Sequence, residues 1–296
     1  MTSVSQSVSD TSWLEALNPP IYLVSVLPGV GVLLLAGEAP VHAGALWLAV
    51  FGVVLLQHAI NLFNDAADWR LGADVDKQDS WVRVHRGRTW PVNVHAVVSV
   101  LAGGALGLVA LASTDQWWLL AAAAPLLLLG YLYNAGPRPL SYTHFGEWVT
   151  GLCYGPGVFG GLWLVAGMPA DWRLFAGAIA FAALAMALLL SHQPPQIATD
   201  RAAGKHSFAV RYGAETTRRS ARKLFVVFAF AVVLGGVLAL TGPVPLLVAV
   251  AAALLVYRVY TGDVNPKRIL GAASLLLVTG IVAARGVIWI GTLSST

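Results

Sequence analysis

The stretch that decides the fold is residues 61–79, NLFNDAADWRLGADVDKQD, which follows about a membrane span of apolar residues. It contains five aspartates within fifteen positions, from Asp65 to Asp79. If the apolar helix continues into this stretch, the polar side chains at positions 61, 64, 65 and 68 share one helical face. Carboxylates close to lipid are costly, and they usually line a protein interior or cavity and act there. Mg²⁺ prefers such oxygen ligands and often shares them with substrate phosphates. The alternative is a charged loop that only caps the helix.

The composition indicates a polytopic membrane protein. Hydrophobic residues make up 57% of the 296 positions and charged residues 11%, and the mean hydropathy is +0.72. Soluble domains carry about a quarter charged residues. The net charge of +4 could suggest nucleic acid, but the basic residues are not gathered into a soluble domain, so we expect no nucleic-acid partner. Cys153 is the only cysteine, which excludes an internal disulfide.

Apolar stretches long enough to span a bilayer predict about nine transmembrane helices in an all-α bundle. They lie near residues 20–36, 43–63, 93–113, 117–134, 148–167, 172–193, 224–240, 243–260 and 269–291. Short links predict helical hairpins over 93–134 and 224–260. Residues 1–19 are rich in serine and carry no Lys or Arg, so we expect a flexible cytoplasmic tail there and a single transmembrane domain over 20–296.

The basic residues predict the orientation of the helices. Most of them fall in the loops after the second, fourth, sixth and eighth helices: Arg70, Lys77, Arg83, Arg86 and Arg88; Arg138; Arg201, Lys205, Arg211, Arg218, Arg219, Arg222 and Lys223; and Arg258, Lys267 and Arg268. By the positive-inside rule these loops are cytoplasmic, with the N-terminus inside and the C-terminus outside. We expect an integral protein of the bacterial inner membrane.

A second polar cluster ends the sixth helix. His192, Gln196 and Asp200 recur every four residues, and Pro194-Pro195 predicts that the helix stops and restarts between them. Both clusters lie on the predicted cytoplasmic side, which favours a site for a metal-bound polyphosphate. Four basic residues would neutralise the charge of the remaining phosphate oxygens, or would be there only because cytoplasmic loops are rich in Lys and Arg. They are Arg70, Lys77, Arg201 and Lys205. His58, one turn before Asn61, is expected to be a hydrogen-bonded interior residue.

Three motifs occur in this order: NDxxDxxxGxD at 64–74; GYLYNAGPRPL at 130–140, running on to Gly146-Glu147; and TDRAAGK at 199–205, running on to Val210-Arg211-Tyr-Gly213. Together they resemble the UbiA superfamily of intramembrane aromatic prenyltransferases. The sequence is most similar to the dihydroxynaphthoate polyprenyltransferases of menaquinone synthesis, which also have glycine at the position of Gly72. Together the motifs cover most of the nine-helix plan.

The resemblance implies a helical bundle around a central cavity, two aspartate-rich motifs that hold Mg²⁺, and a polyprenyl diphosphate beneath cytoplasmic loops. The product would form by attack of an aromatic acceptor on the prenyl carbon, within the lipid bilayer. The implied catalytic residues are Asp65, Asp68 and Asp200, and the implied metal ligands are these three with Asn64. The implied substrate-binding residues are Asn61, Asn64, Asp74, Asp76, Lys77, Arg138, Gln196, Arg201 and Lys205.

Two departures from the family keep alternatives open. The second motif of the family reads Asp-x-x-x-Asp, whereas this chain has Gln196-x-x-x-Asp200 after two prolines, and Asn18-Pro19 stands where Arg-Pro is usual. The glutamine would weaken a second metal site or contact the acceptor instead. The alternatives to aromatic prenyl transfer are a same-fold enzyme that uses another acceptor or cyclises the prenyl chain, and a non-catalytic transporter or binding protein.

Overall fold

The computed structural model describes residues 11–72, 77–134 and 139–294, with side chains as far as Gly286. These residues form helices and connections without a strand. Eight helical segments of the described chain are long and apolar enough to cross a membrane, and the shorter apolar helix Leu119–Asn134 stands beside them. This confirms the predicted all-α bundle of about nine spans, and the chain is an integral membrane protein.

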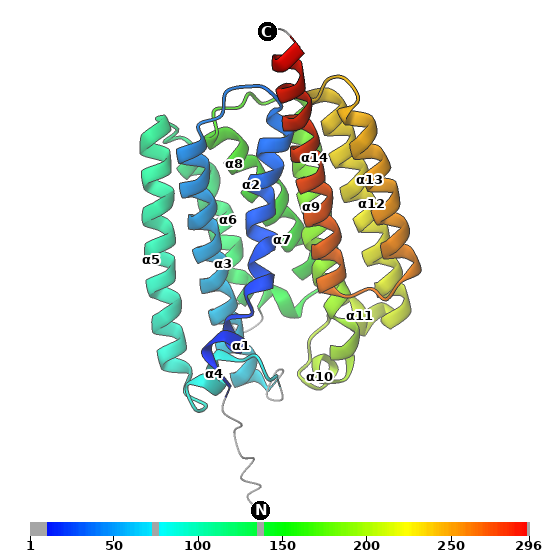
Figure 1. The fold of residues 1–296 in the computed structure, drawn as a ribbon. Helices are drawn as coiled ribbons and strands as arrows, with labels where there is room; N and C mark the ends of the chain where they lie inside the picture. Colours follow the sequence, from blue (N-terminus) through cyan, green and yellow to red (C-terminus); the bar gives the residue numbers. More distant parts are fainter. Residues whose placement is uncertain (1–10, 73–76, 135–138, 295–296) are drawn as a thin grey trace, which may run out of the picture.

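The spans run side by side in one bundle (Figure 1). They are α2 (Leu23–Ala36), α3 (Ala43–Leu71), α5 (Thr89–Thr114), α6 (Leu119–Asn134), α7 with η3 and α8 (Gly146–Leu152, Cys153–Phe159, Gly160–Val165), α9 (Trp172–His192), α12 (Ala214–Ala239), α13 (Val244–Thr261) and α14 (Pro266–Ser294). Short elements connect them: α1 (Trp13–Leu17), η1 (Pro19–Tyr22), α4 (Trp81–Val84), η2 (Leu140–Tyr142), η4 (Pro194–Gln196), α10 (Ile197–Ala202) and α11 (Phe208–Tyr212). The end of the bundle where α1, α4, α10 and α11 lie, at the bottom of Figure 1, is called the polar end below.

Helix α3 is longer than the apolar stretch that predicts it. Its 29 residues extend about 43 Å at 1.5 Å per residue, which exceeds the roughly 30 Å of a bilayer's hydrocarbon core. The acidic motif is therefore helical and lies where α3 leaves the apolar layer. The helix ends at Gly72, whose φ of +78° is left-handed and suits a residue without Cβ.

One half of the bundle is tightly packed. Helices α2, α9, α12, α13 and α14 bury a continuous apolar core between them. Its largest fully buried side chains include Phe159, Trp163, Phe181, Phe225 and Phe228, which meet in stacked and edge contacts. The hairpin predicted over 224–260 is confirmed, because α12 packs on α13.

The other half of the bundle holds a cavity of about 1180 Å³. It is lined mainly by apolar residues of α3, α5, α6 and the α7–α8 span. Helix α5 packs closely on α3, where the Gly103 carbonyl oxygen would lie 3.0 Å from a Cβ added to Gly52. Helices α5 and α6 are joined by the short link predicted over 93–134, but they scarcely contact each other. The short link joins these helices in sequence, but the cavity lies between them.

Two spans are interrupted at proline, and the second interruption is the predicted one at Pro194-Pro195. Gly155-Pro156-Gly157 lies within the π-helical turn η3, because proline cannot donate a backbone hydrogen bond in the middle of a helix. After His192 the chain turns through η4, which begins with Pro194-Pro195, and restarts as α10. The expected N-terminal tail is described only from residue 11, and its last part forms α1, where Trp13 packs edge-on against Trp81.

Candidate active site

The two acidic segments converge at the polar end of the bundle. Asp65 and Asp68 come from the last turns of α3, and Asp200 comes from α10. All three are buried, with exposed fractions of 4%, 1% and 2%. Buried carboxylates are costly unless hydrogen bonds or opposite charges satisfy them, so their partners define the site.

Asp68 is satisfied by three groups from separate parts of the chain. Its Oδ2 accepts a hydrogen bond from Asn64 Nδ2 at 2.8 Å, and its Oδ1 accepts one from the Tyr142 hydroxyl at 2.7 Å. The ammonium of Lys205 lies 3.9 Å from Oδ2. The Lys205 ammonium also lies 5.3 Å from the centre of the Tyr142 ring. Asp68 thus joins α3 to the η2 segment and to the loop after α10.

Asp200 shares the same ammonium. Lys205 Nζ lies 3.8 Å from Asp200 Oδ1, and Ser207 Oγ donates a hydrogen bond of 2.7 Å to Oδ2. Burial raises the pKa of the Asp200 carboxyl, although Lys205 and Ser207 act in the opposite direction. The loop after α10 folds back over Asp200, because Lys205 N donates to the Asp200 carbonyl at 2.8 Å and Gly204 adopts a left-handed φ of +72°.

Asp65 faces the connection that follows α3. Its Oδ2 accepts hydrogen bonds from Ser80 Oγ at 3.0 Å and from the Val82 amide at 3.1 Å, and Lys77 Nζ lies 3.8 Å from Oδ1. These bonds hold the first turn of α4 against α3. Asp65 therefore has a structural role in the fold besides the metal-binding role predicted for it.

The other predicted substrate-binding residues are spread around this centre. Asn61 lies one turn before Asn64 in α3, further from the polar end. Gln196 is half-buried one turn before Asp200, and the described residues show no hydrogen bond to its side-chain amide. Arg201 is exposed on the outer side of α10. Asp74, Asp76 and Arg138 lie outside the described residues.

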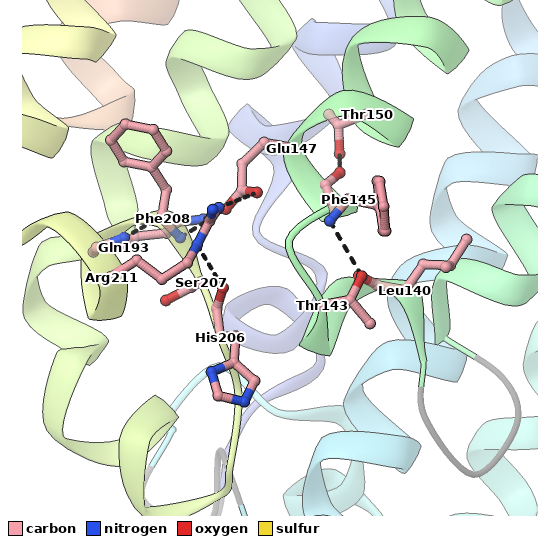
Figure 2. Close-up of polar contacts among 12 residues, drawn as sticks. Leu140, Thr143, Phe145, Glu147, Thr150, Gln193, His206, Ser207, Phe208 and Arg211 are labelled. Carbon is pink, nitrogen blue, oxygen red and sulfur yellow. Dashed lines mark hydrogen bonds and ion pairs between the residues drawn. The ribbon is translucent and has the colours of Figure 1, made fainter.

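Sequence analysis missed several residues that organise the site. Ser80, Tyr142 and Ser207 each hydrogen-bond a predicted catalytic aspartate. A buried network centred on Glu147, at the start of α7, supports the loop that carries Lys205 (Figure 2). Its carboxylate accepts hydrogen bonds from the Phe208 amide at 2.8 Å and from Gln193 Nε2 at 3.1 Å, and it lies 3.4 Å from Arg211. Of these residues, Glu147 and Arg211 had a signal in the sequence, since Glu147 ends the second motif and Arg211 lies in the continuation of the third.

The donor set suits a hard divalent cation that is completed by a substrate. Among the residues that the structure describes, no three His, Cys, Asp or Glu side chains are close enough to form a metal site on their own. Mg²⁺ is commonly held by one or two carboxylates together with water and phosphate oxygens. Asp68 and Asp200 supply two buried carboxylates that lie beside the same Lys205 ammonium. These two are enough for a Mg²⁺ ion that takes its other ligands from water and phosphate, so a third protein carboxylate is not needed.

The cavity extends along the bundle and reaches the last turns of α3, where Ala67 and Arg70 line it, although the carboxylates of Asp65, Asp68 and Asp200 are not part of its lining. Arg70, Asn134 and Pro139 line it near the polar end, while Leu111, Trp118 and Leu119 line it near the opposite end. Asn134 anchors α6 to α3 by donating to the Ile60 carbonyl at 2.8 Å. A polar head bound at the aspartates would therefore lie next to a long apolar space.

Fold and site together define a membrane-embedded helical bundle with a buried acidic centre beside an apolar cavity. The UbiA prenyltransferase family model matches residues 23–263, and the chain belongs to this family. It is a prenyltransferase, as the three motifs predict.

The relatives agree with this assignment. The chain is 30% identical over 226 residues to 1,4-dihydroxy-2-naphthoate octaprenyltransferase of Mycobacterium tuberculosis, which covers 74% of this chain and 76% of the relative. It is 29% identical over 294 residues to 2-carboxy-1,4-naphthoquinone phytyltransferase of a Synechocystis strain, which covers 94% of each chain. The structure of a UbiA homolog from Archaeoglobus fulgidus bound to DMAPP and Mg²⁺ superimposes with a TM-score of 0.66 at 16% identity, over 95% of this chain and 100% of that one. The superposition supports the fold.

Proposed function

We propose that this protein transfers a polyprenyl group from its diphosphate to a dihydroxynaphthoate, with Mg²⁺ as the required cation. One observation carries the proposal. Two buried carboxylates from separate segments, Asp68 and Asp200, share the Lys205 ammonium at 3.9 and 3.8 Å, next to an apolar cavity of about 1180 Å³. A transporter would not need this pairing of buried acids with a cation.

The side chains of the site are suited to hold a diphosphate leaving group. Lys205 and Lys77 each lie beside a buried carboxylate, so their ammonium groups are kept at the site and can face phosphate oxygens. Tyr142 and Asn64 keep the Asp68 carboxylate oriented, and Ser207 does the same for Asp200. When bound, Mg²⁺ supplies charge stabilisation for the departing pyrophosphate.

The cavity is suited to the isoprenoid chain. The α3 residues that line it run from Ala49 to Leu71, which corresponds to about 33 Å of helix at 1.5 Å per residue. This length is comparable to the hydrocarbon core of a bilayer, so a long chain can extend along it. The apolar lining also excludes water, which would otherwise react with an allylic cation.

The acceptor is proposed from the relatives. The Mycobacterium tuberculosis and Synechocystis proteins are named for acceptors that share a naphthalene ring with two oxygens and a carboxyl group, whereas their prenyl donors differ. The shared acceptor supports dihydroxynaphthoate for this chain. An electron-rich ring held next to the allylic carbon can attack it as the carbon–oxygen bond breaks.

We also propose that the polar end faces the cytoplasm of a bacterial cell and that the C-terminus lies outside. The loops rich in Lys and Arg are at the polar end, as the positive-inside rule requires. This orientation is tested by fusing to the C-terminus a reporter enzyme that is active only outside the cytoplasm. The proposed orientation predicts that the fused reporter is active.

The experiment that tests the function measures pyrophosphate release by purified protein in lipid nanodiscs. A prenyl diphosphate is offered with and without dihydroxynaphthoate, with Mg²⁺ or with a chelator, and products are identified by mass spectrometry. The proposal predicts acceptor- and Mg²⁺-dependent release together with a prenylated naphthalene product. Rapid release that does not need the acceptor would support cyclisation or hydrolysis, and no release would support a non-catalytic protein.

A further inference from the structure

A chain of hydrogen-bonded side chains lies beside the acidic centre, and the proposed function does not use it. The Tyr22 hydroxyl, from η1, lies 2.6 Å from Nδ1 of His58 on α3. Nε2 of His58 lies 3.3 Å from Nε2 of His95 on α5. His58 is 7% exposed, so the expectation of a hydrogen-bonded interior histidine is confirmed. Three titratable groups from three helical elements thus form one continuous path.

The geometry allows a proton to move along this path. Each neutral imidazole has one N–H donor and one acceptor nitrogen. Two arrangements satisfy both hydrogen bonds. In one, Tyr22 donates to His58 and His58 donates to His95; in the other, each bond runs in the reverse direction. The two arrangements differ by one proton shifted along every bond, which is the property of a proton relay.

The inner end of the path lies at the wall of the cavity. Gln57, next to His58 in α3, lines the cavity and donates to the carbonyl of Ile21, next to Tyr22, at 3.2 Å. Ser25, one turn after Tyr22, donates to Gln57 Oε1 at 2.6 Å, and its hydroxyl lies 3.5 Å from that of Tyr154, which also lines the cavity. Asn61, one turn after His58 in α3, lies one turn before the site residue Asn64. Tyr22 therefore lies between the cavity and the two histidines.

The outer end of the path lies near the surface of the polar end. His95 is half-buried, and so is His85, which follows α4; Trp13 lies against both rings, at centroid distances of 6.4 and 6.1 Å. Trp81 packs edge-on against both His58 and His95, at ring centroid distances of 5.5 and 5.1 Å. Trp81 and Trp13 therefore cover the pair from the side, and the half-buried His95 is the outer end of the path.

We propose that Tyr22, His58 and His95 relay the hydroxyl proton of the aromatic acceptor between the cavity and the surface of the polar end. This inference rests on the proposed function. As the ring carbon forms its bond to the allylic carbon, the allylic carbon–oxygen bond breaks and its electron pair leaves with pyrophosphate. The acceptor O–H bond also breaks, its electrons form a ring carbonyl, and its proton passes through Tyr22, His58 and His95 to water. When the ring carbon then loses H⁺ or CO₂, the electron pair returns to the ring and the oxygen takes a proton back.

The test compares two rates in the full-length protein in nanodiscs. The first is acceptor-dependent prenyl transfer, and the second is the slow Mg²⁺-dependent pyrophosphate release without acceptor. In His58→Gln and His95→Gln, glutamine can keep a hydrogen bond but cannot relay a proton. We expect transfer to fall roughly 100-fold, as is typical for loss of a general base, with release without acceptor unchanged. The wild type should show a slower transfer rate in D₂O, and release without acceptor should not.

The control is His42→Gln, because His42 is an exposed residue at the opposite end of α3 and lies outside the path. It should leave both rates unchanged. The relay is overturned if the two variants keep full transfer, or if both rates fall together with the melting temperature, which would show a structural role. Failure of the proposed function has a different signature, since wild-type protein would then release no pyrophosphate with the acceptor, Mg²⁺ and donor present.

Discussion

Asp68 on α3 and Asp200 on α10 lie against the same ammonium group, since Lys205 Nζ is 3.9 Å from Asp68 Oδ2 and 3.8 Å from Asp200 Oδ1. The two residues are 132 positions apart in the chain. Lys205 is 17% exposed, whereas both carboxylates are almost fully buried. The acidic motifs are therefore held together by a cation that belongs to the protein.

Lys205→Met should destabilise the metal-free protein. It removes the charge that neutralises two buried carboxylates, and leaving a buried polar group without its partner costs about 1–3 kcal/mol. We expect a lower melting temperature in EDTA, partial recovery in excess Mg²⁺, and a higher KM for the prenyl diphosphate. The control is Lys223→Met, on α12 outside the site. Unchanged stability and KM for Lys205→Met would contradict the shared role of this ammonium.

Asp200→Asn should separate stability from activity. Burial raises the pKa of Asp200, so the folded state binds its proton more tightly than the unfolded state. The protonated carboxyl group therefore contributes to stability at low pH. This contribution is lost as the pH rises from the pKa of the unfolded state, about 3.9, through the raised pKa of the folded state. Near neutral pH the charged carboxylate costs stability, and asparagine removes that cost.

In EDTA at pH 7, thermal unfolding of Asp200→Asn should therefore occur at or above the wild-type temperature, while turnover and the stabilisation by Mg²⁺ are lost. At a pH below the unfolded carboxyl pKa the two proteins should unfold at similar temperatures. A variant that unfolds several degrees lower than wild type in EDTA at pH 7 would show that the carboxylate is stabilising overall.

Substitutions of Asp65 distinguish its two roles. Asp65→Ala leaves the Ser80 hydroxyl and the Val82 amide without their acceptor, which should cost about 1–3 kcal/mol. Asp65→Asn keeps one side-chain oxygen and should retain most of this stability, but it removes the charge that the proposed cation site needs. Turnover and melting temperature are measured for both. Full turnover in Asp65→Asn would assign Asp65 a structural role only.

Gln196→Asp restores the acidic spacing of the family's second motif. Residues four apart share a helical face, so the new carboxylate would lie one turn before Asp200. If Gln196 faces the cation, the concentration of Mg²⁺ that gives half-maximal turnover should fall. An unchanged value would place Gln196 away from the metal, which would agree with the lack of a hydrogen bond between its side chain and the described carboxylates.

The helical plan could be predicted because apolar length and helical periodicity are local properties of a sequence. The helical extension of α3 through Asp68 and the restart of the chain after Pro194-Pro195 were read correctly from spacing and proline chemistry. Over 93–134 the predicted short link is present, but the two helices scarcely contact each other, because a short link shows that helices are neighbours in sequence and not that they pack.

Part of the site could not be predicted, because it depends on contacts between distant residues. Tyr142 reaches Asp68 across 74 positions, and Gln193 reaches Glu147 across 46. A lone Tyr, Ser or Gln near a loop carries no signal for such a contact. The first motif was recognisable because it concentrates carboxylates on one helical face, and the second because polar side chains recur every four residues up to Asp200, whereas the hydrogen-bond donors of the aspartates are mostly single residues in separate loops.

The most direct test of the central claim is a double-mutant cycle between Asp68→Asn and Asp200→Asn. The measured quantity is the affinity of the protein for Mg²⁺ in the presence of an unreactive prenyl thiodiphosphate. Groups that bind one cation together should be coupled, so we predict that the two free-energy losses differ from additivity by more than about 1 kcal/mol. Losses that add within about 0.5 kcal/mol would show two independent sites and contradict the account.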